Sequence, residues 1–169
     1  MTTPAMSAEG ATLLACLRSQ RAHVLGTVEG LDDDSLRRPV LPTGWSMLGM
    51  INHLTYDIEQ FWFPAVVAGE EAVIDELLDG DEGWRVPEDL SARAVLDAYR
   101  RETARADAII AGTPLDTPPE WWPDELFGSF RLDDLREVVL HVITETACHA
   151  GHLDVARELI DGQTWLVLT

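Results

Sequence analysis

Four residues able to take part in catalysis or metal binding lie close together near the C-terminus: His141, Glu145, His149 and His152. At about 100° per residue, an α-helix places the last three about 40°, 80° and 20° from His141, within one narrow wedge. The apolar residues of this segment lie at roughly 60° to 120° on the same helical wheel. They are Leu135, Val138, Val142, Leu153, Ala156 and Ile160. A carboxylate and at least one histidine therefore lie within or beside the face that packs against the core.

An ionised carboxylate on a core-facing stripe is destabilising unless something compensates its charge. A metal ion is one compensator, and an arginine or a pair of histidines is another. His53 lies at the edge of a second apolar stripe, with Asp57 about 40° away, so it can reach across to another helix. Facing helices of bundles commonly supply metal ligands. The residues alone predict either a metal site formed by His53, Glu145 and His149 or a hydrogen-bonded polar cluster.

The donor set restricts the choice of metal. Two nitrogen donors and one oxygen donor suit zinc, nickel or ferrous iron. Three protein ligands leave a coordination position open for water or substrate, as catalytic sites do. His141, His152 and Asp57 are then either residues that orient the ligands or structural polar groups at the edge of the core.

Four long helices are predicted to position these residues, over 7–29, 46–68, 91–111 and 132–160. Ser7 and Ser91 are expected to cap helix starts, and Gly30, Gly69 and Gly162 follow predicted helix ends. The segment 31–43 predicts a short helical turn, and the acidic segment 70–88 a loop with one turn around 73–78. Strands are scarce, so the fold class is all-α. The long link between the second and third helices favours a four-helix bundle with up-down-down-up connectivity, with a simple up-down bundle as the alternative.

The connection over 113–130, which contains TPPEWWPDELFGSF, is long and irregular. Such segments are uncommon unless they shape a site or a lid. The pair Trp121 and Trp122 is a candidate to line a pocket above the metal. The apolar tail 163–168 is expected to cover the end of the bundle, with a homodimer contact as the alternative.

Composition excludes several classes of protein. The net charge is −18, with 30 acidic and 12 basic residues, which argues against a nucleic-acid partner or an anionic membrane surface. Every basic residue is arginine, so catalysis by a lysine, as a Schiff base or a general base, is excluded.

No apolar run is long enough to span a membrane, and no signal peptide is visible, which predicts a cytoplasmic protein. Cys16 and Cys148 are interpreted as small buried apolar residues in a reducing compartment. The length fits one domain, 1–169.

The sequences GWSMLGMINHL, FWF and HVITETACHAGHLDVARELIDG resemble the DinB-like superfamily, from the first helix to Gly162. The closer similarity is to its mycothiol-dependent branch, which includes maleylpyruvate isomerase and bacillithiol- or mycothiol-dependent transferases. The resemblance implies a four-helix bundle whose metal is held by His53 on the second helix and by Glu145 and His149 on the fourth. Many DinB-like proteins have histidine at the position of Glu145, and the mycothiol-dependent branch has glutamate.

Two departures separate this sequence from the maleylpyruvate isomerases. Those enzymes carry an additional C-terminal domain, for which 169 residues leave no room. The sequence also has no arginine cluster suited to an acidic thiol or a dicarboxylate. Arg136 and Arg157 are interpreted as surface ion pairs with Asp133 and Asp154. The resemblance therefore supports the metal site more strongly than the isomerase activity.

The resemblance implies a metal-dependent thiol transferase, either a mycothiol-type S-transferase or an isomerase, acting on a small electrophilic substrate. The expected cofactors are a divalent metal, with zinc favoured over nickel or iron, and a low-molecular-weight thiol such as mycothiol. His152 is the candidate catalytic residue, as a carrier of the thiol proton. The alternatives are a non-catalytic metal-binding stress or regulatory bundle, such as a homodimer, and a purely structural polar cluster.

Overall fold

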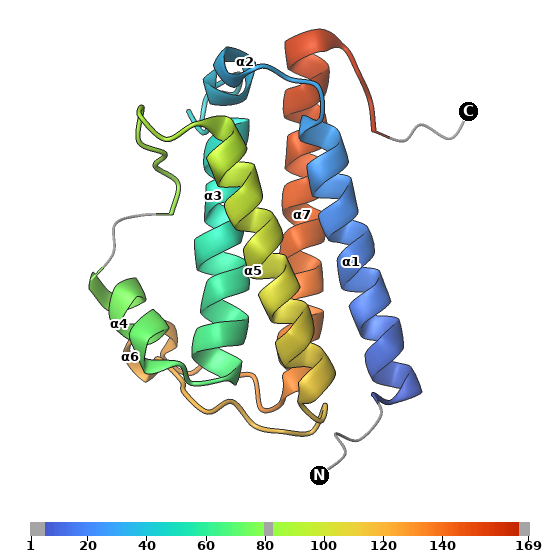
Figure 1. The fold of residues 1–169 in the computed structure, drawn as a ribbon, viewed down its shortest axis with the longest axis vertical. Coiled ribbons are helices and arrows are strands. Elements are labelled where there is room, and N and C mark those ends of the chain that lie inside the picture. The colour runs from blue at the N-terminus through green and yellow to red at the C-terminus, as the bar shows by residue number, and fades with distance from the viewer. Residues whose placement is uncertain (1–5, 80–82, 166–169) are drawn as a thin grey trace.

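The computed structural model describes residues 6–79 and 83–165, and no strand occurs among them. This confirms the all-α fold class. Figure 1 shows the chain as a set of long helices with shorter helices at their ends. In chain order the elements are α1 (Ala8–Val28), α2 (Asp33–Arg37), α3 (Met47–His53), η1 (Leu54–Val67), α4 (Glu71–Asp79), α5 (Ala92–Gly112), α6 (Asp124–Phe127) and α7 (Leu135–Asp161).

The helix starts follow local sequence signals. The hydroxyl groups of Ser7, Ser46 and Ser91 accept hydrogen bonds from backbone N–H groups in the first turns of α1, α3 and α5. Such caps satisfy donors that a helix start leaves unpaired. The last long helix begins three residues later than predicted, because Asp134 caps it by accepting from Glu137 N–H. Gly162 then ends it with a φ of 75°, a left-handed conformation that favours glycine.

The predicted helix over 46–68 is continuous, but its second part is a π-helix. α3 passes directly into η1, and the N–H of Ala68 donates to the carbonyl of Phe63, five residues earlier, at 2.9 Å. Pro64 lies inside this element. Because π-helical hydrogen bonds join residues five apart, each residue turns the chain less than in an α-helix. Residues four apart along the chain are therefore separated by a smaller angle around the helix axis than a wheel of 100° per residue predicts.

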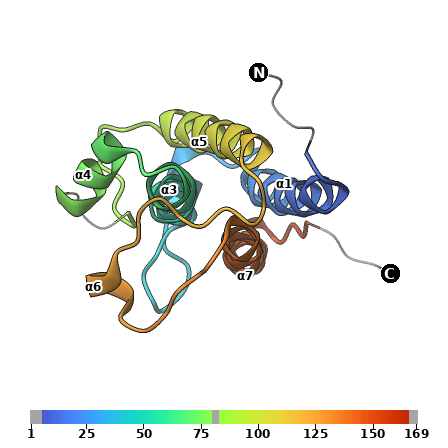
Figure 2. The same ribbon diagram turned by 90° about the horizontal axis from the view of Figure 1, so that it is seen from below.

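The long segments lie side by side (Figures 1 and 2). In Figure 1, α1 and α7 run upward, and α3–η1 and α5 run downward, as the colours show. α1 packs mainly on α7, and α5 mainly on η1. The side chains of Leu17, Phe63, Tyr99 and Leu153 are fully buried between them. α4 and α6 lie to one side of η1 in the view from below (Figure 2).

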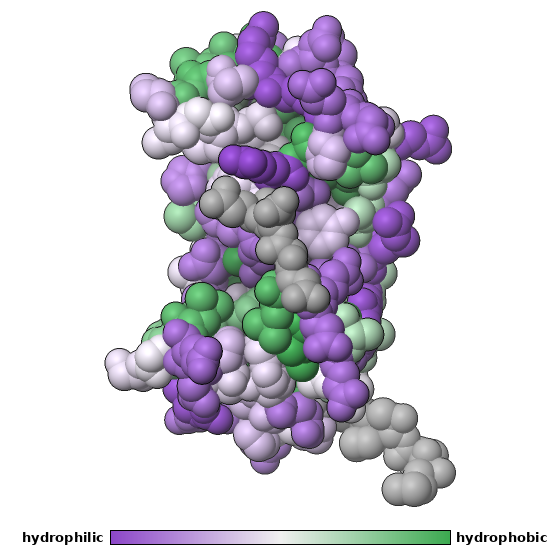
Figure 3. Space-filling model, turned by 90° about the vertical axis from the view of Figure 1, so that its left-hand side faces the viewer, coloured by the Kyte–Doolittle hydropathy of each residue, from purple (hydrophilic) through white to green (hydrophobic). Residues whose placement is uncertain are grey.

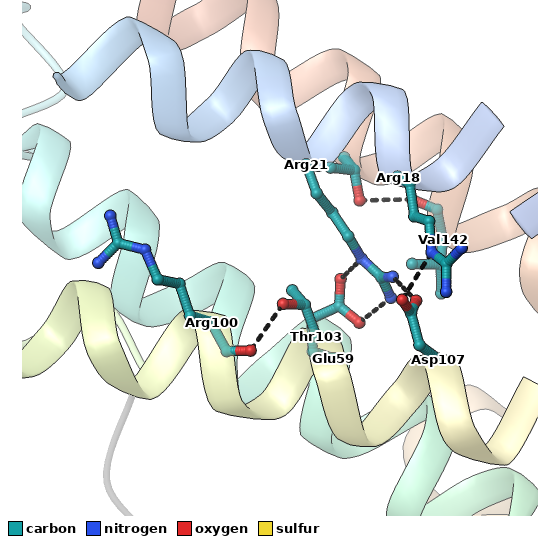
Figure 4. A network of polar contacts seen from close by, with 8 residues as sticks. Arg18, Arg21, Glu59, Arg100, Thr103, Asp107 and Val142 are labelled. Carbon is teal, nitrogen blue, oxygen red and sulfur yellow. Dashed lines mark hydrogen bonds and ion pairs between the residues drawn. The ribbon is translucent and has the colours of Figure 1, made fainter. Parts of the chain in front are cut away.

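A charged network crosses this core (Figure 4). Arg21 of α1 donates through Nε and Nη2 to the two carboxylate oxygens of Glu59 in η1, at 2.6 and 2.5 Å. Its Nη1 donates to Asp107 of α5 at 2.6 Å. The side chains of Arg21 and Glu59 are only 5% and 1% exposed. The network ties three long helices together.

Several sequence-based expectations about single residues were wrong. Cys16 and Cys148 are exposed rather than buried, because both lie on outward faces of their helices. Arg157 is buried and does not pair with Asp154: its Nη1 donates to the carbonyls of Thr27 and Glu29 at the end of α1. Those carbonyls have no partner within their own helix, so a buried guanidinium satisfies them.

Arg136 also has other partners than expected. It pairs with Glu9 and Asp134 rather than with Asp133. The acidic segment after Gly69 forms a nine-residue helix, α4, where only one turn was expected. At the C-terminus, Trp165 stacks on His23 of α1 with 5.1 Å between ring centroids but stays 44% exposed. Residues 166–168 of the expected tail lie outside the described part of the chain.

Candidate functional site

The three residues predicted as metal ligands lie close together between α3 and α7. The imidazole rings of His53 and His149 meet edge to face, with 5.0 Å between their centroids. Glu145 lies one helical turn before His149 on α7, and its Oε2 is 3.7 Å from His149 Nε2. Both histidine side chains are 14% exposed, and Glu145 is 37% exposed. A carboxylate and two imidazoles therefore share one partly buried position.

Asp57 fixes the orientation of His53. Its Oδ2 lies 2.7 Å from His53 Nδ1, one π-helical turn further along the chain. This contact occupies Nδ1 and leaves Nε2 as the nitrogen that can bind another group. A carboxylate bonded to the far nitrogen is the usual partner of a metal-binding histidine.

A loop that the sequence did not link to the site covers His53 from the other side. Trp84 stacks on the His53 ring at 4.2 Å between centroids. Gly83 passes so close that a Cβ there would stand 2.3 Å from Asp57 Oδ2. No local signal marks these two residues as site residues, because they reach the site only through the path of the loop before α5.

The electrostatics of the cluster keep one histidine neutral. Burial, helped by the neighbouring His53 and His152 and opposed by Glu145, lowers the pKa of His149 to about 4. Uncharged imidazole is the form that binds metals. Within the described residues, Glu145 forms no ion pair with an arginine. The cluster therefore lacks the cation that would compensate its carboxylate from within the chain.

The donor set fits a divalent metal, although the side chains do not form a closed site. Among residues 6–79 and 83–165, no group of three or more His, Cys, Asp and Glu side chains is arranged to hold a metal ion. Two donors on one tetrahedral zinc ion stand about 3.3 to 3.5 Å apart, given bonds of about 2.0 to 2.2 Å. The 3.7 Å between Glu145 and His149 is close to this separation. The ligand assignment of His53, Glu145 and His149 stays a prediction.

The other two histidines of the wedge differ in their surroundings. His152 is exposed, and its Nδ1 lies 3.5 Å from Nδ1 of His149. His141 instead contacts aromatic side chains, Trp62 at 4.7 Å and Phe130 at 5.8 Å between centroids. Burial lowers the pKa of His141. His152 thus borders the cluster, whereas His141 belongs to an aromatic wall next to it.

Two cavities adjoin the cluster and share Asp57. One, of about 1010 Å³, lies between η1, α4, the segment around α6 and α7, and its lining includes Glu145 and His141. The other, of about 620 Å³, is lined largely by polar residues. They include Asn52, Tyr56, Gln60, Glu76, Arg85 and Glu88. The cluster therefore lies where two chemically different cavities meet.

The protein is thus a helical protein with a histidine–carboxylate site between its long helices, next to two cavities. The family model of mycothiol-S-transferase matches residues 12–162. The chain belongs to this family, which confirms the resemblance to the mycothiol-dependent branch of DinB-like proteins. No curated protein and no solved structure gives a significant match to the chain. None of the described helices combines the length and apolarity needed to cross a bilayer.

Proposed function

We propose that this protein is a metal-dependent S-transferase that joins a mycothiol-type thiol to a small electrophile. The observation that carries the proposal is the juxtaposition of His53, Glu145 and His149 in a chain of the mycothiol-S-transferase family. The family implies a low-molecular-weight thiol and a small-molecule substrate. The cluster supplies neutral imidazole and carboxylate donors next to two cavities.

The fold we propose is a single DinB-like four-helix bundle over 1–169 with up-down-down-up connectivity. The directions of α1, α3–η1, α5 and α7 in Figure 1 support it. The link through α4 returns the chain to the upper end before α5 begins (Figure 1). This connectivity brings the end of α3 beside the middle of α7, where the cluster lies.

In this proposal His53 Nε2, Glu145 and His149 hold the metal, with zinc favoured. The bound metal would supply the positive charge that converts the cofactor thiol to a thiolate near neutral pH. Asp57 holds the His53 ring through Nδ1, and Trp84 packs on its face, so that Nε2 keeps one direction. His149 needs no deprotonation before it binds, because burial already keeps it neutral.

The transfer forms a carbon–sulfur bond. A sulfur lone pair attacks the electrophilic carbon, and either a leaving group departs with its bonding electrons or a carbon–oxygen bond opens. The thiol proton must leave before the attack. His152 is exposed at the edge of the cluster, so its ring can take up this proton and release it to water.

The polar cavity is a suitable binding place for the thiol. Tyr56, Gln60 and Glu88 offer donors and acceptors for a hydroxyl-rich molecule such as mycothiol, and Arg85 offers one cation. Asp57 belongs both to this cavity and to the cluster, which supports the proposal that a thiol cofactor bound there would have its thiol end near His53.

The test combines metal content with transfer. Elemental analysis of the untagged protein is expected to find close to one zinc per chain, and mycothiol with a bimane electrophile is expected to react faster with the protein than without it. His53→Ala is expected to lose both properties. His23→Ala is the matched control, because His23 pairs with Asp154 on the α1–α7 face and should leave both unchanged.

The outcomes separate the proposal from its alternatives. Metal without any acceleration would support a non-catalytic metal-binding bundle. A metal content far below one per chain, together with no acceleration on added zinc, would support a structural polar cluster. Equal behaviour of His53→Ala and His23→Ala would contradict the assigned site.

A further inference from the structure

The larger cavity beside the cluster has an aromatic wall. Its rings form an unbroken series of contacts between η1, the segment around α6 and α7. Trp62 stacks on Phe127 at 5.6 Å and meets Trp122 at 5.9 Å between centroids. Phe61 meets Trp121 at 6.1 Å, and His141 meets Trp62 at 4.7 Å. Ring faces and edges at these separations favour stacking with another planar ring.

Apart from His141, the titratable groups of the same cavity are acidic. Asp57, Asp124, Glu125 and Glu145 line it, and its described lining contains no arginine. Arg131 lies over the Trp122 ring at 5.4 Å, outside the lining, and its charge is already paired with Asp124 at 3.6 Å. An anionic molecule entering the cavity would meet two carboxylates, Asp57 and Glu125, that have no arginine partner among the described residues, besides Asp124 and the proposed metal ligand Glu145.

The wall also contains a donor without a partner. Nε1 of Trp122 is buried and has no acceptor among the described residues. A buried unpaired N–H is unusual in a folded protein and calls for a physical reason. A ligand with an acceptor atom, such as a nitro or carbonyl oxygen, could supply the missing partner after a small movement of the indole.

The exposed surface agrees with an apolar ligand. Leu78 and Leu126, both in the lining, are 69% and 67% exposed. Figure 3 shows hydrophobic residues reaching the surface in the lower half of the face that carries α4 and α6. Exposed apolar groups next to a cavity mark a place where an apolar partner binds.

From these observations we infer that the larger cavity binds an uncharged aromatic electrophile and discriminates against anionic ones. The inference rests on the proposed function, because it assigns the second substrate of the same transfer. Glu145 lines this cavity, and Asp57 lies between it and the polar cavity. A planar ring on the aromatic wall would therefore present its reactive carbon toward the thiol end of the cofactor.

With a chloronitroarene the transfer is an aromatic substitution. The thiol loses its proton to His152 or water, and the sulfur lone pair forms a carbon–sulfur bond at the ring carbon that carries chlorine. The carbon–chlorine bond breaks, and chloride leaves with its electron pair. The products are the aryl thioether, chloride and a proton.

Binding of unreactive probes tests the inference without metal or thiol. 1,3-Dinitrobenzene and 3,5-dinitrobenzoate have the same ring and differ by one negative charge, and both quench tryptophan fluorescence. We expect the benzoate to bind at least about tenfold more weakly than the neutral ring. Phe127→Leu is expected to weaken binding of the neutral probe about fivefold, because it removes one stacking partner.

A charge-introducing variant tests the discrimination directly. Leu126→Arg places a cation in the lining at an exposed position and is expected to reduce the preference for the neutral probe at least about fivefold. Leu159→Arg is the matched control, since Leu159 is similarly exposed, at 57%, but lies near the end of α7 outside the lining. It should keep the wild-type preference.

Transfer assays separate failure of this inference from failure of the proposed function. 1-Chloro-2,4-dinitrobenzene is expected to react faster than 4-chloro-3,5-dinitrobenzoate relative to their uncatalysed rates. Selective probe binding without any transfer would leave the inference standing and overturn the transferase. Transfer without probe selectivity, or equal effects of Leu126→Arg and Leu159→Arg, would overturn the inference alone.

Discussion

Two carboxylates of the long helices, those of Glu59 and Glu145, are compensated differently. Glu59 is fully buried and receives two hydrogen bonds from Arg21, which also pairs with Asp107 (Figure 4). Glu145 is partly buried, and among the described residues its one ion-pair contact is with the His149 imidazole, at 3.7 Å. The first cluster, of Arg21, Glu59 and Asp107, has its own cation and is called the closed cluster. The second, of His53, Glu145 and His149, lacks a cation and is called the open cluster. The difference indicates where the protein has room for a bound ion.

The two clusters meet in one element. Glu59 and Asp57 are two residues apart in η1, and they face different partners, Arg21 of α1 and His53 of α3. Charge from Glu59 and Asp107 raises the pKa of Arg21, even though burial alone would lower it. Burial raises the pKa of Glu59 in the closed cluster, and the charge of Arg21 opposes that shift. In the open cluster, burial lowers the pKa of His149 to about 4, so its imidazole ring stays neutral until the solution is acidic.

The largest expected effect comes from breaking the closed cluster. Arg21→Met leaves the buried Glu59 carboxylate without its partner, and such changes lower the free energy of unfolding by about 3 to 5 kcal/mol. Urea unfolding followed by circular dichroism measures this loss. Arg18→Met is the control, because Arg18 contacts the same Asp107 from a side chain that is 59% exposed.

The double variant Arg21→Met, Glu59→Leu sharpens this result. Replacing both members of a buried pair by apolar residues removes the unpaired charge, so much of the lost stability should return. A loss in Arg21→Met no larger than in Arg18→Met would contradict the view that the closed cluster depends on its buried charge pair.

The open cluster should respond to metal where the closed one does not. Zinc that binds only the folded protein at 100 times its dissociation constant raises the free energy of unfolding by about 2.7 kcal/mol. Calorimetry with zinc and with a chelator measures this shift in wild type and in Glu145→Ala. The shift should vanish in Glu145→Ala and persist in Arg18→Met. A zinc-induced shift that survives Glu145→Ala would place the metal elsewhere.

Acid should destabilise the metal-free protein through the open cluster. The pKa of His149 is about 4 in the folded state, lowered by burial, against 6.5 in an unfolded chain. Because the unfolded state takes up the proton first, stability from neutral His149 is complete above pH 6.5 and is lost as the pH falls toward 4. The expected loss between pH 6.5 and pH 4 is about 2.6 kcal/mol.

His149→Gln isolates this contribution. Its side chain does not titrate, so urea unfolding between pH 7 and pH 4 should show a smaller pH dependence than wild type, with the difference confined to that interval. His23→Gln serves as the control at the other histidine–aspartate pair of α1 and α7, which is partly buried. Parallel pH profiles for wild type and His149→Gln would show that His149 titrates normally.

The sequence predicted those features that local chemistry determines. Ser7 and Ser91 cap helices, Gly162 ends the last one, and the four-residue spacing of Glu145 and His149 places both on one face of α7. Each of these depends on residues a few positions apart. The partnership of Arg21 with Glu59 was missed because neither residue has a local pattern that reveals its distant partner.

Helical period and long-range packing explain the remaining errors. The wheel assumed 100° per residue through 46–68 and did not predict the π-helix Leu54–Val67, although it placed Asp57 near enough to orient His53, as their 2.7 Å contact confirms. Trp84 and Gly83 reach the site from a loop whose path no local signal specifies. Arg157 resembled a surface residue, yet it satisfies the terminal carbonyls of α1, which only the packed helices bring within its reach.

The smallest expected effect concerns Asp57, which supports the open cluster without belonging to the assigned ligands. Asp57→Asn keeps the size of the side chain but removes the negative charge that orients the His53 ring. Zinc affinity, measured by competition with a chromophoric chelator, should fall about tenfold, which is about 1.4 kcal/mol. Asp154→Asn is the matched control, because it changes the other histidine–aspartate pair, His23 with Asp154 at 2.9 Å. Equal zinc affinities of the two variants would show that Asp57 does not support the metal site, and the open cluster would then depend on His53, Glu145 and His149 alone.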